Sequence, residues 1–241
     1  PMAGMMTGGD DNTVGLVNAG TCGQGGDDEN GITFTTPLIP GSTACITVNA
    51  MNMTGSAALL YGWIDFNGDG VFGTGEQLNT GSFAGGTVTV PAGGLTDASL
   101  CFTVPSDAIF KGGVAFSRFR LSPNTGLTPN GPGGNGEVED YKLPLALIGN
   151  YVWMDNPDIE GDQDATEMPL ANVKVNLTFA GEDGVFQTAA NSSVAAGDDR
   201  VYMSTTDANG RYEFRGLIPS TNYRILPDKY TAATGVAGAP I

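Results

Sequence analysis

The chain has 241 residues, enough for two ordinary domains that each bury a core, and its 26 acidic and 10 basic residues give a formal net charge of −16. A field of this sign repels phosphate backbones and anionic lipids, and no stretch reaches the roughly 18 to 20 apolar residues that span a bilayer, so we expect neither a nucleic-acid partner nor membrane insertion. The chain contains no histidine, which removes the commonest general base and zinc ligand and leaves hard divalent cations as the expected ligands.

The first 31 residues are rich in Gly, Asn and Asp and show little periodicity apart from TVGLV at residues 13–17, so we expect a loop or a weak edge strand there. The chain begins with PMAGMM and is expected to be a piece of a longer exported protein. Val14 and Leu16 would present one apolar face if this segment were added as a strand to the open sheet edge of a neighbouring copy. We therefore expect a homo-polymer, while the alternative, that residues 1–20 fold back on their own domain, stays open.

From residue 31 onward the sequence is typical of an all-β protein. The 37 glycines and 14 prolines of the chain disfavour helices, and runs rich in Val, Thr and Phe recur at the spacing of a β-sandwich. The first set of runs is GITFTTPLI, ACITVNAMN, LLYGWIDF, GTVTV, SLCFTVP, VAFSRFRLS and EVEDYKLPL, and the second is GNYVWMD, NVKVNLTF, RVYMSTT, RYEFRGL and NYRILP. The short apolar seam LPLALIG separates the two sets. We predict two β-sandwich domains in tandem, over residues 1–147 and 148–241.

Two of the three cysteines lie in expected strands of the first domain. Cys45 is in STACITVNA and Cys101 is in ASLCFTVP, and we predict a disulfide between them, which would imply an oxidising compartment. Two free buried thiols are the alternative. Cys22, in the glycine-rich TCGQGG, is left without a predicted partner.

The stretch DFNGDGVFGTGE, residues 65–76, has the spacing of a calcium-binding loop. Side-chain oxygens stand at positions 1, 3 and 5, a backbone carbonyl at position 7 and a glutamate at position 12, which are Asp65, Asn67, Asp69, Val71 and Glu76. The preceding YGWI is typical of a strand, so we expect a strand to replace the helix that usually enters such a loop. A solvated hairpin of Asx turns is the alternative, because Asp, Asn and Gly are also turn residues.

A second acidic stretch, WMDNPDIEGDQDATE, carries six carboxylates within 13 residues, which repel one another unless a cation neutralises them. With Asn156 as position 1, the ligands at positions 3, 5, 7, 9 and 12 would be Asp158, Glu160, the Asp162 carbonyl, Asp164 and Glu167. Asp155 competes with Asn156 for the first position. We predict a second calcium site here, with a merely solvated acidic loop as the alternative.

Asp207 lies in TTDANGRYEF, for which two interpretations stay open. The stretch is either a plain hairpin with its turn at Asn209 and Gly210, or a source of one more oxygen for the second calcium site.

The first domain also holds charged residues that could pair or act in catalysis. Arg118 and Arg120 in FSRFRLS are either exposed strand residues or partners of Glu137, Glu139 or Asp140 in GEVEDY. A glycosidase could in principle use Glu137 with Asp140. No nucleophile, base and oxyanion set can be named beside them, so we predict that the chain is not an enzyme.

Three pieces of the first domain, GDDENGITF, GWIDFNGDGVFGTGE and NGEVEDY preceded by FSRFRLS, resemble the GEVED domain of bacterial secreted and surface proteins, over roughly residues 26–145. In the second domain GNYVWMD, GDQDATE, PLANVKVNL and TTDANGRYEFRGLIPSTNYRI resemble the B-type repeat of serine-aspartate-repeat adhesins, over roughly residues 148–230. The second resemblance implies a prealbumin-like sandwich of the collagen-adhesin B type, stabilised by calcium and used as a spacer.

Together these features predict a calcium-stabilised structural module of a bacterial extracellular surface protein, serving as a stalk, adhesin or filament subunit. Its expected partners are copies of itself or neighbouring domains of the same protein. The alternative function is a module that binds a glycan or a host or cell-surface protein through loops on a sandwich rim.

Overall fold

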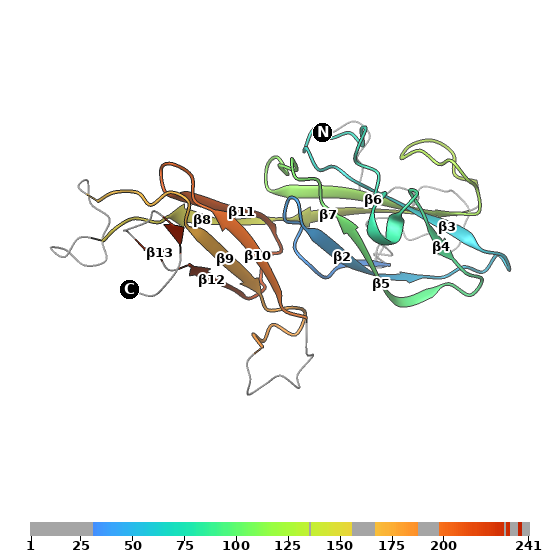
Figure 1. The fold of residues 1–241 in the computed structure, drawn as a ribbon. Helices are drawn as coiled ribbons and strands as arrows, with labels where there is room; N and C mark the ends of the chain where they lie inside the picture. The colour runs from blue at the N-terminus through green and yellow to red at the C-terminus, as the bar shows by residue number, and fades with distance from the viewer. Residues whose placement is uncertain are drawn as a thin grey trace. The chain divides into compact units, whose positions relative to one another are not determined.

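The structure is a computed structural model that describes residues 31–134, 136–155, 167–187, 198–228, 230–231 and 236–237. Nearly all of its regular structure is β, which confirms the predicted fold class (Figure 1). The chain divides into two compact units, Pro1–Leu145 and Ala146–Ile241, so the division falls two residues before the predicted boundary. No helix among the described residues is long and apolar enough to cross a membrane.

The first unit contains two antiparallel sheets, with strand orders β1-β2-β5 and β4-β3-β6-β7. The strands are β1 (Ile32–Phe34), β2 (Thr43–Ala50), β3 (Ala58–Ile64), β4 (Val88–Val90), β5 (Leu95–Thr103), β6 (Val114–Ser122) and β7 (Glu137–Pro144). One turn of 3₁₀ helix, η1 (Gly81–Phe83), lies between β3 and β4 in the sequence. The two sheets form a sandwich with a shared apolar core.

Alternation of side chains along the strands builds this core. On β2 the side chains of Ala44, Ile46 and Val48 are completely buried, while the residues between them face outward. The same cluster takes in residues from β1, β3, β4, β5 and β6, together with Phe83 from η1. Phe83 packs edge-to-face on Phe102, with ring centroids 6.4 Å apart.

The paired strands β3 and β6 are buried on both faces. Their inner faces carry core residues such as Leu60 and Phe119. Their outer faces carry Tyr61, Trp63 and Arg118, which are also buried. Two loops must therefore cover the outer side of this sheet, and they form the candidate functional site described below.

The second unit contains a sheet of order β10-β9-β12, a two-stranded sheet of β11 and β8, and a short pair of β13 and β14. The strands are β8 (Ala146–Tyr151), β9 (Lys174–Phe179), β10 (Arg200–Thr205), β11 (Arg211–Leu217), β12 (Tyr223–Pro227), β13 (Tyr230–Thr231) and β14 (Val236–Ala237). The inward residues of β9, Val175, Leu177 and Phe179, are almost completely buried. Phe214 and Leu217 of β11 are also buried, as expected of a small β-sandwich.

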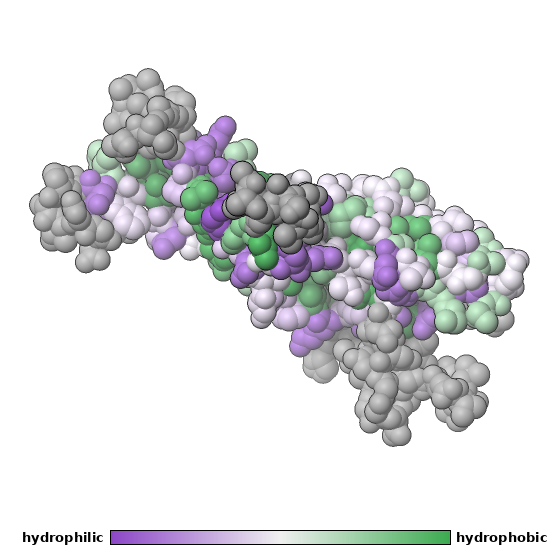
Figure 2. Space-filling model, turned by 90° about the horizontal axis from the view of Figure 1, so that it is seen from below, coloured by the Kyte–Doolittle hydropathy of each residue, from purple (hydrophilic) through white to green (hydrophobic). Residues whose placement is uncertain are grey.

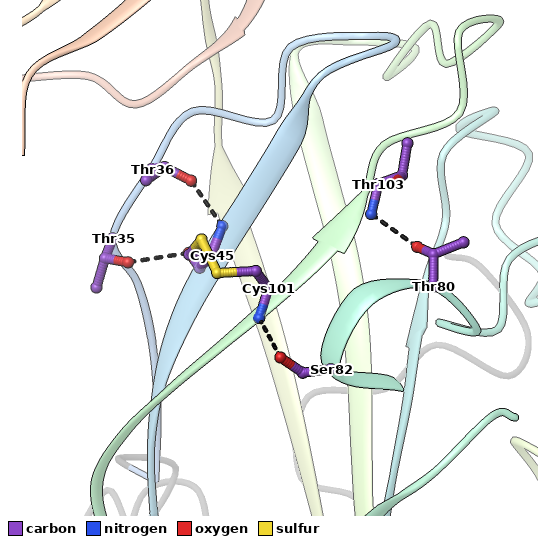
Figure 3. The surroundings of a disulfide bond; sticks show 7 residues. All are labelled: Thr35, Thr36, Cys45, Thr80, Ser82, Cys101 and Thr103. Carbon is purple, nitrogen blue, oxygen red and sulfur yellow. Dashed lines mark hydrogen bonds between the residues drawn. A yellow bond between two sulfur atoms is a disulfide. The ribbon is translucent and has the colours of Figure 1, made fainter. Parts of the chain in front are cut away.

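Cys45 and Cys101 are joined by a disulfide, as the sequence predicted. The two residues lie directly opposite each other on β2 and β5. Figure 3 shows that nearby hydroxyls hold the backbone around the bridge: Thr36 accepts a hydrogen bond from the Cys45 amide, and Ser82 accepts one from the Cys101 amide. The third cysteine, Cys22, lies outside the described residues.

Replacing both bridged cysteines, Cys45→Ala with Cys101→Ala, should lower the free energy of unfolding by about 4 kcal/mol. The closed loop spans 56 residues in sequence, and opening it restores the chain entropy of the unfolded state. Urea unfolding of the oxidised wild-type chain and the double variant measures the difference. Equal midpoints and slopes for the two proteins would show that the bridge does not stabilise the fold.

Candidate functional site

The predicted calcium loop, residues 65–76, begins where β3 ends, and both of its ends are held by strand-like bonds. The Ile64 amide donates to the Glu76 carbonyl at 2.9 Å, and Trp63 forms a bridge with Gln77. The Leu78 amide donates to the Gly62 carbonyl at 2.8 Å. A strand therefore enters the loop in place of a helix, as predicted, and the returning chain closes it.

Asp65 accepts hydrogen bonds from three backbone amides of this loop. It is 0% exposed, and its Oδ1 accepts hydrogen bonds from the amides of Gly68 and Asp69 at 2.7 and 3.2 Å. Its Oδ2 accepts from the Gly70 amide at 2.9 Å. Because a carboxylate offers about four lone-pair sites, three amide bonds orient Asp65 and leave it capacity for a further partner.

The next two predicted ligands are oriented in the same way. Asn67 Oδ1 accepts from the Asp69 amide at 2.7 Å, and Asp69 Oδ1 accepts from the Val71 amide at 2.9 Å. These are the Asx turns that the sequence offered as the alternative interpretation. The turns are compatible with a cation site, because each leaves an oxygen of Asn67 or Asp69 with lone pairs to spare.

Glu76, the residue at position 12, folds back over the loop. It is 4% exposed and accepts from the amides of Gly73 at 2.7 Å and Asn67 at 3.3 Å. Burial raises the pKa of Glu76; those two amide bonds lower the pKa, and the nearby charges of Asp65 and Asp69 raise it again. A buried carboxylate near other acids is stabilised by a proton or by a cation, and this donor set of carboxylate and amide oxygens is the kind that calcium takes.

Within the described residues, no three Cys, Asp or Glu side chains stand close enough together to hold a metal ion. The acidic side chains of the loop point to backbone amides instead. Binding of a cation at residues 65–76 would therefore draw Asp65, Asp69 and Glu76 closer together than they stand in this structure.

The loop is also held from outside, at Phe66 and at Gly68, by one neighbouring segment. Ile109 and Phe110 both donate from their amides to the Phe66 carbonyl, at 2.9 and 3.1 Å. A Cβ on Gly68, whose φ is +68°, would stand 2.5 Å from the backbone nitrogen of Lys111, so only glycine fits there. The first half of the loop is thus fixed against the segment that follows β5.

Only the ends of the second predicted site lie in the described part of the chain. Asn156, Asp158, Glu160, Asp162 and Asp164 fall within residues 156–166, outside it. The ends of the loop lie side by side, because the Met154 amide donates to the Met168 carbonyl at 2.9 Å and Trp153 bridges to Pro169. Glu167 is 8% exposed and Asp155 is exposed, so the two predicted end ligands differ in burial.

Asp207 begins a turn between β10 and β11, and because these strands belong to different sheets, the stretch is a turn between sheets and not the plain hairpin that was one of its two interpretations. Its Oδ1 accepts from the amides of Asn209 and Arg211 at 2.8 and 2.9 Å. The turn lies beside the base of the acidic loop, since the Val152 amide donates to the Gly210 carbonyl at 2.8 Å. Its second interpretation, as a ligand of the acidic loop, stays a prediction.

A buried ion pair covers the outer face of β6. Arg118 donates from Nε and Nη2 to the two carboxylate oxygens of Asp140, at 2.7 and 2.6 Å, and the hydrogen bond to Asp140 raises the pKa of Arg118. Its Nη1 donates to the Pro129 carbonyl and the Asn130 side chain, both at 3.0 Å. The predicted pairing is therefore confirmed for Arg118 with Asp140.

Arg120 binds the same covering loop, and within the described residues it forms no salt bridge. It donates to the carbonyls of Thr128 at 2.7 Å and Gly131 at 2.8 Å, while its Nε is buried and has no hydrogen bond. Burial lowers the pKa of Arg120, and the charge of Arg118 lowers it further. Residues 123–134 are thus bound to the sheet by two arginines through backbone carbonyls, an arrangement that the sequence did not predict.

The two covering loops meet in a small apolar cluster on this face. Tyr61 and Trp63 stack with ring centroids 5.8 Å apart, and Phe72 of the predicted calcium loop and Leu127 of the second loop pack with them. The Arg118 guanidinium lies 5.9 Å from the centre of the Phe72 ring. The candidate calcium loop and the arginine-held loop therefore share contacts.

Glu137 and Asp140 do not form the carboxylate pair that a glycosidase needs. They are three residues apart on β7, so they point to opposite faces of the sheet. Asp140 is engaged with Arg118, and Glu137 lies opposite the core-facing Leu121. This pair cannot flank one glycosidic bond.

Asp140→Asn should lower the free energy of unfolding by about 3 kcal/mol, because it leaves the buried Arg118 charge without its counter-ion. Both side chains of this pair are about one tenth exposed, at 10% and 9%. Glu213→Gln is the matched control, since the Arg215–Glu213 pair is 40% and 41% exposed and should contribute less than about 1 kcal/mol. Urea unfolding decides, and equal losses in the two variants would contradict the assignment.

Comparison with known proteins gives one family match in each unit. Residues 59–144 match the family model of the GEVED domain, and residues 146–239 match that of the SdrD B-like domain. The boundary between the two matches agrees with the division of the fold between Leu145 and Ala146.

The chain is also similar to curated proteins of Staphylococcus aureus. It is 33% identical over 111 residues to a serine-aspartate repeat-containing protein E, covering 45% of this chain and 8% of that protein. It is 35% identical over 113 residues to a bone sialoprotein-binding protein, covering 46% of this chain and 8% of that protein. The chain thus spans less than a tenth of the length of either relative.

Proposed function

Because the chain is a GEVED domain followed by an SdrD B-like domain, we propose that it is a calcium-stabilised structural module, used as a stalk or adhesin segment. Its place is extracellular, at the bacterial cell surface, as the sequence predicted. The relatives support a surface module without enzymatic activity. The observation that carries the calcium proposal is Glu76, a buried carboxylate with a raised pKa in a loop of oxygen donors.

The way in which residues 65–76 are held explains how a bound cation would stabilise this loop. Residues 65–76 connect to β3 at one end and to a strand-like bridge at the other. A cation shared by Asp65, Asp69 and Glu76 would cross-link the loop at the edge of the outer face and oppose its opening under load. Asn67 and the Val71 carbonyl would supply further oxygens.

A role in binding a host protein has support from one relative. That relative is named as a bone sialoprotein-binding protein, so we propose a protein ligand ahead of a glycan for the whole surface protein. The predicted end-to-end association through residues 13–17 stays a prediction, because these residues lie outside the described part of the chain.

Calcium should raise the melting temperature of the chain, with a gain of about 2.7 kcal/mol in unfolding free energy when the ion is at about a hundred times its dissociation constant. Melting is measured in excess chelator and in millimolar calcium. Glu76→Gln should abolish the part of the gain due to the first loop, while Glu182→Gln, an exposed change in the other unit, should keep it. The same melting temperature with chelator and with calcium would exclude the proposal.

The calcium gain should shrink as the solution becomes more acidic. Since the pKa of Glu76 is raised on folding, the folded chain holds this proton more tightly than the unfolded chain does. The proton's contribution to stability is therefore complete below the ordinary carboxyl pKa and is lost as pH rises through the raised pKa. Calcium competes with that proton, so its effect is largest above the raised pKa and falls below it.

Melting curves with and without calcium between about pH 4 and pH 8 test this dependence. In Glu76→Gln, the rise in melting temperature that calcium still causes should no longer change with pH over the range in which the Glu76 carboxyl titrates. A calcium gain that is constant over the whole range would show that Glu76 does not bind the ion.

A further inference from the structure

The chain contains five asparagines that are followed directly by glycine, and on the face drawn in Figure 2 hydrophobic residues form separate groups among hydrophilic ones. Asn-Gly pairs in polar, wetted loops are the asparagine sites most open to spontaneous loss of ammonia, because glycine carries no side chain to crowd the attacking backbone nitrogen. Three of the five pairs lie wholly in the described part of the chain: Asn67–Gly68, Asn130–Gly131 and Asn209–Gly210.

The glycine amides of these three pairs have different partners. The Gly68 amide donates to Asp65 Oδ1 at 2.7 Å, and the Gly210 amide donates to the Asp207 carbonyl at 3.0 Å. An amide held by an acceptor resists loss of its proton, because the acceptor would then face a negative charge. The Gly131 amide donates no hydrogen bond to any described residue, and Gly131 is exposed whereas Gly210 is buried. Of the three, the Gly131 amide is therefore the most open to deprotonation by hydroxide.

Asn130 also has a cation aimed at its side-chain oxygen. Arg118 Nη1 donates to Asn130 Oδ1 at 3.0 Å, while Nε and Nη2 of the same guanidinium are held by Asp140 at 2.7 and 2.6 Å. Attack of a nitrogen on the Asn130 Cγ would place negative charge on Oδ1, and a donor fixed beforehand beside that oxygen stabilises such a charge. The corresponding oxygen of Asn67 accepts from the neutral Asp69 amide instead.

We propose that Asn130 is a site of self-modification, at which the chain converts this asparagine to aspartate or isoaspartate without an enzyme. Hydroxide takes the proton of the Gly131 amide, whose nitrogen forms a bond to the Asn130 Cγ while Oδ1 carries the negative charge beside Arg118. The bond from Cγ to Nδ2 then breaks, and Nδ2 takes a proton from water and leaves as ammonia. Water opens the resulting succinimide at either carbonyl, and no atom is oxidised or reduced.

The products change how the covering loop is held. Either product places a new carboxylate where it competes with Asp140 for Arg118. In the isoaspartate product the main chain runs through Cγ and is one carbon longer, so the Gly131 carbonyl shifts from its place 2.8 Å from Arg120 Nη2. The modification therefore loosens residues 123–134 over the outer face of β3 and β6. It does not involve calcium and goes beyond the structural role proposed above.

The test follows all three pairs in one sample of the full chain, kept at mildly alkaline pH. Peptide mapping by mass spectrometry, with fragmentation that distinguishes isoaspartate from aspartate, gives the rate of conversion at each asparagine. A parallel sample in guanidinium chloride gives the rates in the unfolded chain, where all three asparagines have the same following residue. Folding should slow Asn67 and Asn209 by at least about tenfold and should leave Asn130 at least as fast as in the unfolded chain.

A double variant isolates the contribution of Arg118. Arg118→Gln with Asp140→Asn removes both charges of the pair together, so neither is left buried and unpaired. Conversion of Asn130 in the folded variant should be about tenfold slower than in the wild type, while the rates at Asn67 and Asn209 should not change. In guanidinium chloride the variant and the wild type should convert alike. Melting curves show whether the variant is folded, and the wild-type comparison above decides the proposal without it.

A second measurement follows the loosening of the loop. The wild-type chain, after incubation, should be cut by subtilisin within residues 123–134 faster than fresh chain is. Asn130→Gln, incubated in the same way, should keep the rate of fresh chain, because glutamine forms the corresponding larger ring far more slowly.

Two outcomes would overturn the proposal. If folding protects Asn130 as strongly as it protects Asn67 and Asn209, the loop holds the side chain away from the Gly131 nitrogen and the site is inert. If the folded double variant converts Asn130 at the wild-type rate, Arg118 does not stabilise the charge on Oδ1.

Discussion

Strands β6 and β7 meet a different environment on each face, and the alternation of side chains along a strand is the constraint on which the first unit depends. On β6, Phe119 and Leu121 face the core while Arg118 and Arg120 face the covering loop. On β7 the same alternation places successive residues of GEVEDY on opposite faces of the sheet. Glu139 and Tyr141 face β1, where the Tyr141 hydroxyl accepts from the Ile32 amide and donates to Glu139, whereas Asp140 faces Arg118. A one-residue slip in this pairing would exchange all of these contacts.

Burying the charged side chains on the outer face of β6 and β7 costs free energy, and hydrogen-bond and ion-pair partners offset that cost. Arg118 has a full counter-ion and two further acceptors, so its charge is compensated. Among the described residues Arg120 has only carbonyl acceptors, one of its nitrogens has no hydrogen bond there, and burial lowers its pKa. The two arginines act together, because each binds carbonyls of residues 128–131 and so holds a glycine- and proline-rich loop that has no apolar core of its own.

The elements that follow from local pattern could be predicted from the sequence, and those that depend on long-range geometry could not. Strand alternation and turn residues predicted the strands, and Cys45 and Cys101 lay in two of them. Their disulfide was predicted with two free thiols as the alternative, because only the pairing of β2 with β5 places the two cysteines opposite each other. The run YGWI predicted the strand that enters residues 65–76, which the structure confirms, whereas the calcium site predicted from the spacing stays a prediction. The choice of Asp140 for Arg118 depends on the register of β7 against β6, and the carbonyls that bind Arg120 have no signature in the side-chain sequence.

The contacts of Phe72 connect the proposed metal loop to the rest of the outer face. Phe72 belongs to the loop that would hold calcium, yet it packs with Tyr61 and Trp63 of β3 and lies beside Arg118. Leu127, from the loop that the arginines hold, joins the same cluster. Ordering of residues 65–76 by a cation would therefore restrict Phe72 and, through it, the cover over the buried ion pair. The opposite sheet relies on the disulfide between β2 and β5. The two sheets of the sandwich are thus stabilised by different means, one covalent and one that would respond to calcium.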